Sequence, residues 1–280
     1  MNIKTLYIND LQVKTLYING KQVKIGGSEP ELDCLCFTAN TPGSTVKMVK
    51  HEGGVNVNLQ YSTNGKNWSP FVVGTTTVTL TNIGDKVWIK ANGSNQKMAY
   101  DDETYNGFVM TGSIAASGNV NSLLEEDEET ARTMSLEGKC FCRLFYGCSS
   151  LTTAPELPST TIGGTTYYYM FSRTSLTEAP ELPATNVGYR SYMSMFSQCT
   201  SLTTPPQLSA TTLDQDCYRS MFVGCSSLKI SDTPVSGGVK FMDIPSDATV
   251  GNFWNEKMFL NTGGTYTSDP QVGHAYYYYT

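Results

Sequence analysis

The sequence has little charge and almost no histidine. Charged residues make up 16% of the 280 residues, the formal net charge is −6, and the two histidines, His51 and His274, lie far apart in the chain. No cluster of Lys and Arg is present, so nucleic acid is not expected as a partner, because phosphate binding requires concentrated positive charge. Two isolated histidines also leave few general bases near neutral pH.

Long apolar runs are missing as well. The chain begins MNIK and continues as polar, alternating sequence, without the apolar stretch that an export signal requires. No run approaches the length of a membrane span, so membrane insertion is not expected. These absences predict a protein that is made in a cytoplasm and released by a route other than the secretion pathway.

Motifs that carry catalysis are absent too. There is no Gly-rich phosphate loop, no nucleophile elbow and no His-containing metal motif. Glu156 and Glu181 could resemble the carboxylate pair of a glycosidase, but they occupy the same position in a repeat, so duplication explains them. Such a pair would also need an asymmetric environment that separates the two pKa values. We therefore expect no enzymatic activity and no cofactor.

The eight cysteines do not read as a disulfide framework. The chain is long and lacks an export signal, and most of the cysteines recur at fixed repeat positions. The pairs Cys34/Cys36 and Cys140/Cys142 lack the two-residue gap of common zinc motifs. We expect buried, reduced thiols and no structural metal site.

Residues 1–28 contain a near-perfect duplication. Residues 4–13 read KTLYINDLQV and are followed at once by KTLYINGKQV at 14–23. The Asn-Asp and Asn-Gly pairs suit two-residue hairpin turns, so the pattern predicts a meander of three short strands, too small to be stable alone. It either attaches the protein to a partner or packs on its own next domain. The proposed attachment residues are Leu6, Tyr7, Ile8, Leu16, Tyr17 and Ile18.

Residues 29–124 show short β-runs separated by turn signals. Runs at 55–61, 77–80 and 86–90 alternate with Asn-Gly or Gly-Asp pairs. This spacing predicts a β-sandwich of jelly-roll or immunoglobulin-like type, with Tyr61 and Trp88 in its core. The acidic linker 125–138 follows. Consecutive carboxylates could hold calcium, but without an alternating ligand pattern a solvated face that caps a short helix is the preferred interpretation.

Residues 139–230 repeat with a period of 25 or 26 residues. The repeats contain Met-Phe-x-x-Cys-x-Ser-Leu and Ala-Pro-Glu-Leu-Pro, and an aromatic residue stands four positions before each anchoring Phe. An i, i+4 pair shares one face of a helix, so a short helix should direct both aromatics into the core. The anchors are Phe145, Phe171, Phe196 and Phe222, and their partners are Phe141, Tyr167, Tyr192 and Tyr218.

This motif resembles the BspA-like leucine-rich repeats of surface proteins from gut bacteria and their phages, including crAss-like phages of Bacteroides. The resemblance is strong over residues 139–230 and moderate in segments 61–68 and 117–124. It implies a mainly β fold with short helices, in which a parallel-sheet solenoid follows the ribbon and the sandwich. Pro155, Pro180 and Pro206 depart from the family where its strand should run, so that sheet should be irregular. Residues 231–280 should cap the open end.

Two functions follow from the resemblance. The first is a virion fibre or decoration protein of the phage head or tail, with a role in adhesion or receptor binding; the alternative is a bacterial cell-surface adhesin. The missing export signal and the duplicated ribbon favour the virion. Expected partners are other capsid or tail proteins and a host-surface glycan or protein, and a homo-oligomer is left open. The candidate binding residues are Arg143, Tyr168, Tyr169 and Arg219, which could equally be ordinary solvated or inter-subunit residues.

Overall fold

The computed structural model describes residues 7–8, 11–12, 16–18, 21–23, 32–208 and 210–280. β-Strands dominate these residues, as the sequence predicts, and the chain divides into two units, Met1–Asp33 and Cys34–Thr280.

The N-terminal unit contains two separate hairpins. Strand β1 (Tyr7–Ile8) pairs antiparallel with β2 (Leu11–Gln12), and β3 (Leu16–Ile18) pairs with β4 (Lys21–Val23). The prediction of a three-stranded meander is therefore wrong for the described strands. The pairing register leaves two residues between the partners in each hairpin, so each copy of the duplication closes on itself.

Two antiparallel sheets pack face to face at the start of the second unit. One has the order β12-β5-β10-β7-β8 and the other β11-β6-β9. Alternate residues of the long strands are buried, and the rings of Phe37 and Phe108, one from each sheet, lie 5.0 Å apart. The strands are β5 (Leu35–Ala39), β6 (Ser44–His51), β7 (Leu59–Ser62), β8 (Ser69–Phe71), β9 (Thr77–Leu80), β10 (Lys86–Ala91), β11 (Tyr105–Thr111) and β12 (Ile114–Ser117).

The sequence prediction of this region is confirmed in its strands and wrong for one core residue. The runs at 77–80 and 86–90 are strands, whereas the run at 55–61 becomes extended only at Leu59. Tyr61 packs against the core. Trp88 does not, because the alternation of β10 places it half-buried on the opposite face, where the Lys86 ammonium lies 5.9 Å from its ring.

Short helical elements separate the sheets from the repeats. A 3-10 helix (Val120–Leu123) precedes α1 (Glu128–Thr133), and the Asp127 carboxylate caps α1 by accepting a hydrogen bond from the Thr130 N–H at 2.9 Å. Glu126 accepts one from the Gly93 N–H, also at 2.9 Å. Local donors therefore engage these carboxylates of the acidic linker.

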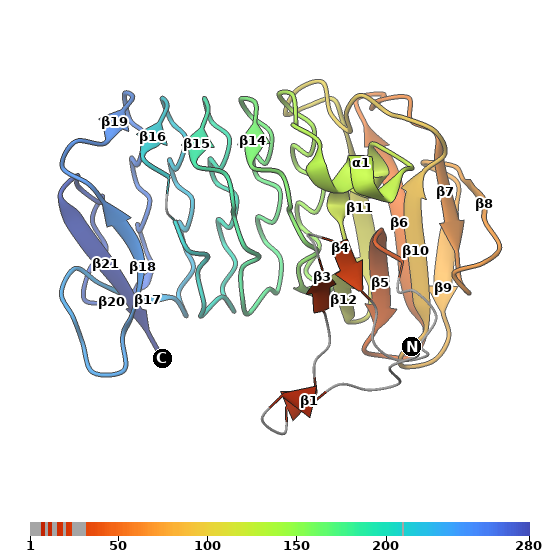
Figure 1. Ribbon diagram of the computed structural model, residues 1–280, viewed down its shortest axis with the longest axis horizontal. Helices are drawn as coiled ribbons and strands as arrows, with labels where there is room; N and C mark the ends of the chain where they lie inside the picture. Colours follow the sequence, from red (N-terminus) through yellow and green to blue (C-terminus); the bar gives the residue numbers. More distant parts are fainter. Residues whose placement is uncertain (1–6, 9–10, 13–15, 19–20, 24–31, 209) are drawn as a thin grey trace. The chain divides into compact units, whose positions relative to one another are not determined.

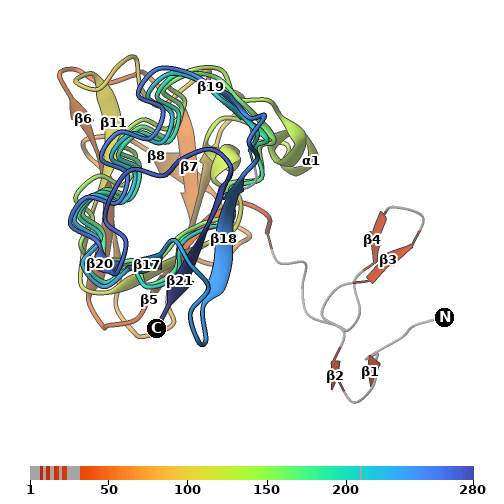
Figure 2. The ribbon, with the colours of Figure 1, turned by 90° about the vertical axis from the view of Figure 1, so that its left-hand side faces the viewer.

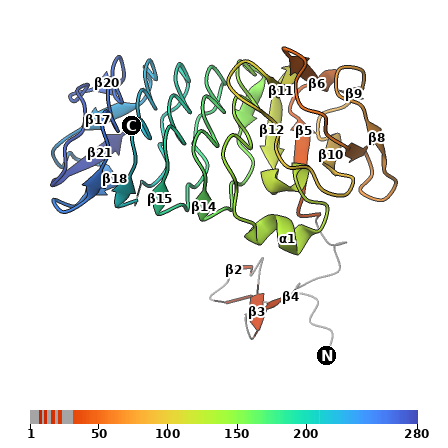
Figure 3. The ribbon, with the colours of Figure 1, turned by 90° about the horizontal axis from the view of Figure 1, so that it is seen from above.

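From residue 139 the chain winds into five stacked coils, which Figures 1 and 3 show side by side. Short strands at equivalent positions pair in parallel in the order β14-β15-β16-β19, so each coil lies directly on the next. The first coil also extends the larger sheet, because β13 (Leu151–Thr153) pairs with β12. The others are β14 (Thr161–Ile162), β15 (Asn186–Val187), β16 (Thr212–Leu213) and β19 (Thr249–Val250).

The aromatic segments of the coils are tandem turns, so the prediction of short helices there is wrong. Alternate N–H groups donate to the neighbouring coil, as Phe145 does to the Met170 carbonyl at 3.0 Å, while the intervening ones bond within a turn. Every fourth residue adopts a left-handed conformation, for example Arg143 at φ 57° and Tyr169 at φ 54°. A helix would use all these N–H groups internally and leave nothing for the stacking of coils.

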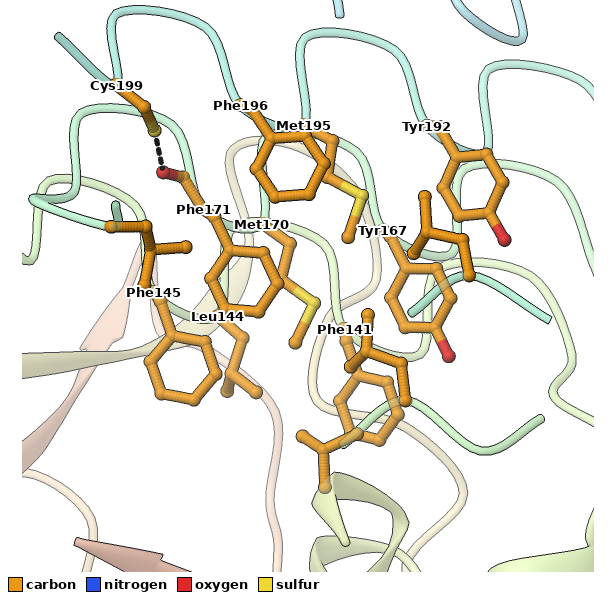
Figure 4. Close-up of a cluster of buried hydrophobic side chains, with 14 of the residues drawn as sticks. Phe141, Leu144, Phe145, Tyr167, Met170, Phe171, Tyr192, Met195, Phe196 and Cys199 are labelled. Atoms are coloured by element: carbon orange, nitrogen blue, oxygen red, sulfur yellow. Dashed lines mark hydrogen bonds between the residues drawn. The ribbon is translucent and has the colours of Figure 1, made fainter. Parts of the chain in front are cut away.

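The inward direction of the aromatics is confirmed, because the turns also repeat every four residues. The phenylalanine rings stack from coil to coil at 5.4, 5.8, 5.7 and 6.1 Å, in the order Phe145, Phe171, Phe196, Phe222 and Phe259. A second, parallel row contains Phe141, Tyr167, Tyr192 and Tyr218, of which Figure 4 labels the first three. These rows form one hydrophobic core with the sheets.

The aligned cysteines connect the coils. Cys199 Sγ donates to the Phe171 carbonyl at 3.0 Å (Figure 4), and Cys225 Sγ makes the same contact with Phe196. In the shorter second repeat Thr174 stands in for the missing cysteine, and its hydroxyl lies 3.3 Å from Cys199 Sγ.

All eight cysteines are buried with free thiols. Burial raises the pKa of Cys140 to about 11 and that of Cys142 to about 12, so neither forms the reactive thiolate near neutral pH. We predict slow alkylation of the native protein at pH 8 and the addition of eight alkyl groups, seen by intact mass, after denaturation without reductant. A pair that resists alkylation in denaturant would contradict this.

The C-terminal residues form a small sheet of order β18-β21-β17-β20 against the fifth coil. Phe259 belongs to a fifth, degenerate repeat, since its ring continues the stack on Phe222. The strands are β17 (Lys229–Ser231), β18 (Val239–Ile244), β20 (Gly263–Gly264) and β21 (His274–Tyr279).

Candidate functional site

The predicted attachment residues belong to the N-terminal hairpins. Tyr7 and Ile8 form β1, and residues 16–18 form β3, while Leu6 lies outside the described residues. These strands belong to a unit of their own, separate from the sheets and coils.

Three of the four candidate binding residues meet on one surface. The Arg143 guanidinium lies 5.1 Å from the centre of the Tyr169 ring, and the rings of Tyr168 and Tyr169 make an edge contact at 4.6 Å. Two tyrosines that sequence reasoning missed complete the cluster: Tyr146 at 5.0 Å and Tyr105 at 5.8 Å from the guanidinium. We call these five residues the tyrosine–arginine cluster.

The stacking of coils brings this cluster together. Arg143 and Tyr169 hold equivalent, left-handed positions in consecutive coils, and the Arg143 N–H donates to the Tyr168 carbonyl at 2.9 Å. A cation over several aromatic faces is stabilised by each ring quadrupole. The guanidinium is thereby held in one orientation, and its buried Nε has no hydrogen-bond partner among the described residues.

Arg219 belongs to a different arrangement. It donates to the Asp216 carboxylate at 3.2 Å and pairs with Glu256 at 2.8 Å. Asp216 is almost fully buried, and its carboxylate also forms an ion pair with the Arg190 guanidinium at 3.4 Å. Arg219 therefore neutralises a buried acid between the coils and does not join the tyrosine–arginine cluster.

An open cleft of about 520 Å³ lies beside the cluster. Its other side is formed by strand ends and a loop of the two-sheet region, and its lining residues are His51, Glu52, Asp102, Glu103, Tyr105 and Arg143. His51 stacks on Tyr105 at 4.2 Å because β6 and β11 pair these two residues. No local motif in the sequence signals this meeting, since the lining residues come from strand ends far apart in the chain.

The cleft combines one cation with several acids. Desolvation lowers the pKa of His51, and the positive charge of Arg143 lowers it further, so the imidazole is neutral at pH 7. Burial raises the pKa of Tyr105, whose hydroxyl stays protonated. The surface therefore presents acceptors at Glu52, Asp102 and Glu103 beside the fixed donor Arg143, a combination suited to a polar ligand with hydroxyl or amide groups.

A scan against family models, a search of curated proteins and a search of solved structures all give no match for this chain. Within the described part of the chain, no three or more His, Cys, Asp and Glu side chains are grouped so as to hold a metal ion. No helix among the described residues has the length and apolarity needed to cross a membrane.

Proposed function

We propose that this chain is a non-enzymatic structural protein of a phage particle, a fibre or decoration protein of the head or tail that binds the host surface. In this proposal residues 139–230 form a BspA-like leucine-rich-repeat solenoid. Its support is the agreement between the period of the sequence and the stacking of the coils, in which each repeat places one Phe on the next at 5.4 to 5.8 Å. A stack of this kind is a rigid platform for recognition.

The observation that carries the binding role is the tyrosine–arginine cluster at the edge of the cleft. Arg143 is half-buried among three tyrosine rings, so little side-chain entropy remains to be lost when a ligand binds. Tyrosine and arginine are also the residue types that dominate binding energy at interfaces. The expected ligand is a glycan or protein of the host surface.

The N-terminal unit supports a second role, attachment to the particle. Within the described residues its hairpins have two strands each, and such small sheets gain stability by docking on a larger surface. Deleting residues 1–25 should leave 34–280 folded and abolish incorporation into particles.

The binding role is tested by adsorption of particles, or of the purified chain, to host cells. We predict that Tyr169→Ala and Arg143→Ala each weaken adsorption about thirtyfold, the effect of losing about 2 kcal/mol at an interface hot spot. Tyr189→Ala is the matched control, because Tyr189 is an exposed tyrosine under Arg190 in the third coil, outside the cleft. Thermal unfolding of each variant separates lost binding from lost folding.

Two results would contradict the proposal. Equal adsorption of the Tyr169 and Tyr189 variants would show that the edge of the cleft is not the binding surface. A chain that is absent from purified particles and present on the surface of a bacterium would instead support the cell-surface adhesin.

A further inference from the structure

The terminal coil has an unpaired row of backbone donors. In each of the first four coils, five alternate N–H groups donate to carbonyl oxygens of the following coil. In the fourth coil these distances run from 2.7 to 3.1 Å, from Asp216, Tyr218, Ser220, Phe222 and Gly224. The equivalent residues of the fifth coil have no backbone or side-chain acceptor for their N–H groups in the described structure: Phe253, Asn255, Lys257, Phe259 and Asn261.

The residues after the fifth coil cover its core with side chains, but their backbone does not pair with its row of N–H groups. The rings of Tyr266 and Tyr276 pack on Phe259 at 6.2 and 5.9 Å, and the Asn255 side chain donates to the Pro270 carbonyl. Figure 2 views this end of the stack, where the terminal coil faces outward. The C-terminal residues thus cover the ring of Phe259, while the backbone row stays unpaired.

Apolar side chains gather at the same end. Phe253 is 62% exposed and Leu260 is 40% exposed, at the two ends of the row. They lie in a segment that holds half of the large, exposed hydrophobic residues of the described chain, together with Val239, Val250 and Val272. Exposed apolar side chains at both ends of a row of free backbone donors, here Phe253 and Leu260, are typical of an interaction surface.

We propose that the terminal coil binds a segment of another protein, which adds to the stack as a further rung. Donors at alternate residues match alternate carbonyls of a segment that follows the same turn path, as each coil does for the coil before it. The proposal rests on the proposed function in one respect: the partner is another protein of the particle.

Neither end of the stack in a second copy of this chain fits this row. Two terminal coils facing each other would both offer donors, because the carbonyls of Phe253 and Lys257 already accept from Glu256 and Leu260 within the turns. The first coil cannot stack there either, since its Cys140 and Leu144 carbonyls accept from the two-sheet region. Stacking of two copies end to end therefore leaves the row of donors unpaired.

Hydrogen exchange measured by mass spectrometry tests this, with the isolated chain compared with the chain in purified particles. Peptides covering 252–262 should exchange about tenfold or more slowly in the particle, because pairing protects the five amides. Peptides around Val72, an exposed residue of the two-sheet region, serve as the internal reference. The double variant Phe253→Lys/Leu260→Lys should lose this protection, whereas Val72→Lys should keep it.

Each alternative has its own signature. Unchanged exchange at 252–262 in particles that contain the chain would overturn this inference and leave the proposed function standing. Dimerisation of the isolated chain that Phe253→Lys abolishes would assign the surface to a second copy and overturn it as well. Absence of the chain from particles would overturn both proposals.

Discussion

Replacing Phe196 with alanine is expected to lower the free energy of unfolding by about 3–5 kcal/mol, the usual cost of deleting a buried aromatic ring. Phe196 is fully buried, and its ring lies between Phe171 at 5.8 Å and Phe222 at 5.7 Å. The backbone around it is tied into three coils, so the neighbours cannot close the cavity by moving together. Urea denaturation followed by fluorescence or circular dichroism measures the loss.

Phe253→Ala is the matched control, because Phe253 has the same side chain in a coil but is 62% exposed. Truncation there should change the stability of the isolated chain by no more than about 0.5 kcal/mol. Similar losses for the two variants would show that the stacked rings do not form the stabilising core of the coils.

Gly118→Ala is expected to lower the free energy of unfolding by about 2–5 kcal/mol, the sum of a conformational and a steric cost. Gly118 has φ +71°, a conformation that costs an alanine about 1–2 kcal/mol. An added Cβ would also lie 2.1 Å from the carbonyl oxygen of Cys34, a main-chain atom that can move only if the first strand of the unit moves. Forced overpacking of that kind costs about 1–3 kcal/mol in addition.

Gly43→Ala measures the conformational part of this effect, so that the difference between the two variants gives the steric part. Gly43 has a similar φ of +73°, but a Cβ there would meet nothing within 4 Å. Its cost should therefore stay at about 1–2 kcal/mol, the conformational part alone. Equal losses in the two variants, measured by the same denaturation curves, would refute the clash at Cys34.

The coils were predictable from the sequence because their core repeats visibly. Leu and Phe recur at fixed offsets in the first four coils, and Cys recurs in three of them, always at the same inward positions. The conformation between them was not predictable in the same way. A spacing of four residues occurs both in a helix and in tandem turns, and the choice depends on whether an N–H such as that of Phe145 bonds within its own segment or to Met170 of the next coil. That neighbour is supplied by the tertiary structure.

The candidate site shows the same division. The repeat pattern predicted Arg143 and Tyr169 on the outward side, at equivalent positions of consecutive coils, and the stacking of the coils brings them together. The same reasoning suggested Arg219, at the position equivalent to Tyr168, but the buried Asp216 three residues earlier forms an ion pair with that side chain. His51 and Asp102 reach the cleft through strand pairing and loop position, which no local pattern in the sequence reports.

The coils of the stack keep the same geometry even when the number of residues between them differs. Phe222 and Phe259 are 37 residues apart, against 25 or 26 for the earlier pairs, yet their rings still stack at 6.1 Å. The extra length holds β18 and its loops, which leave the main axis and return in register. The connection between the fourth and fifth coils is thus a natural insertion point, where new loops or a small grafted module would alter the outline of the protein and leave its backbone scaffold unchanged.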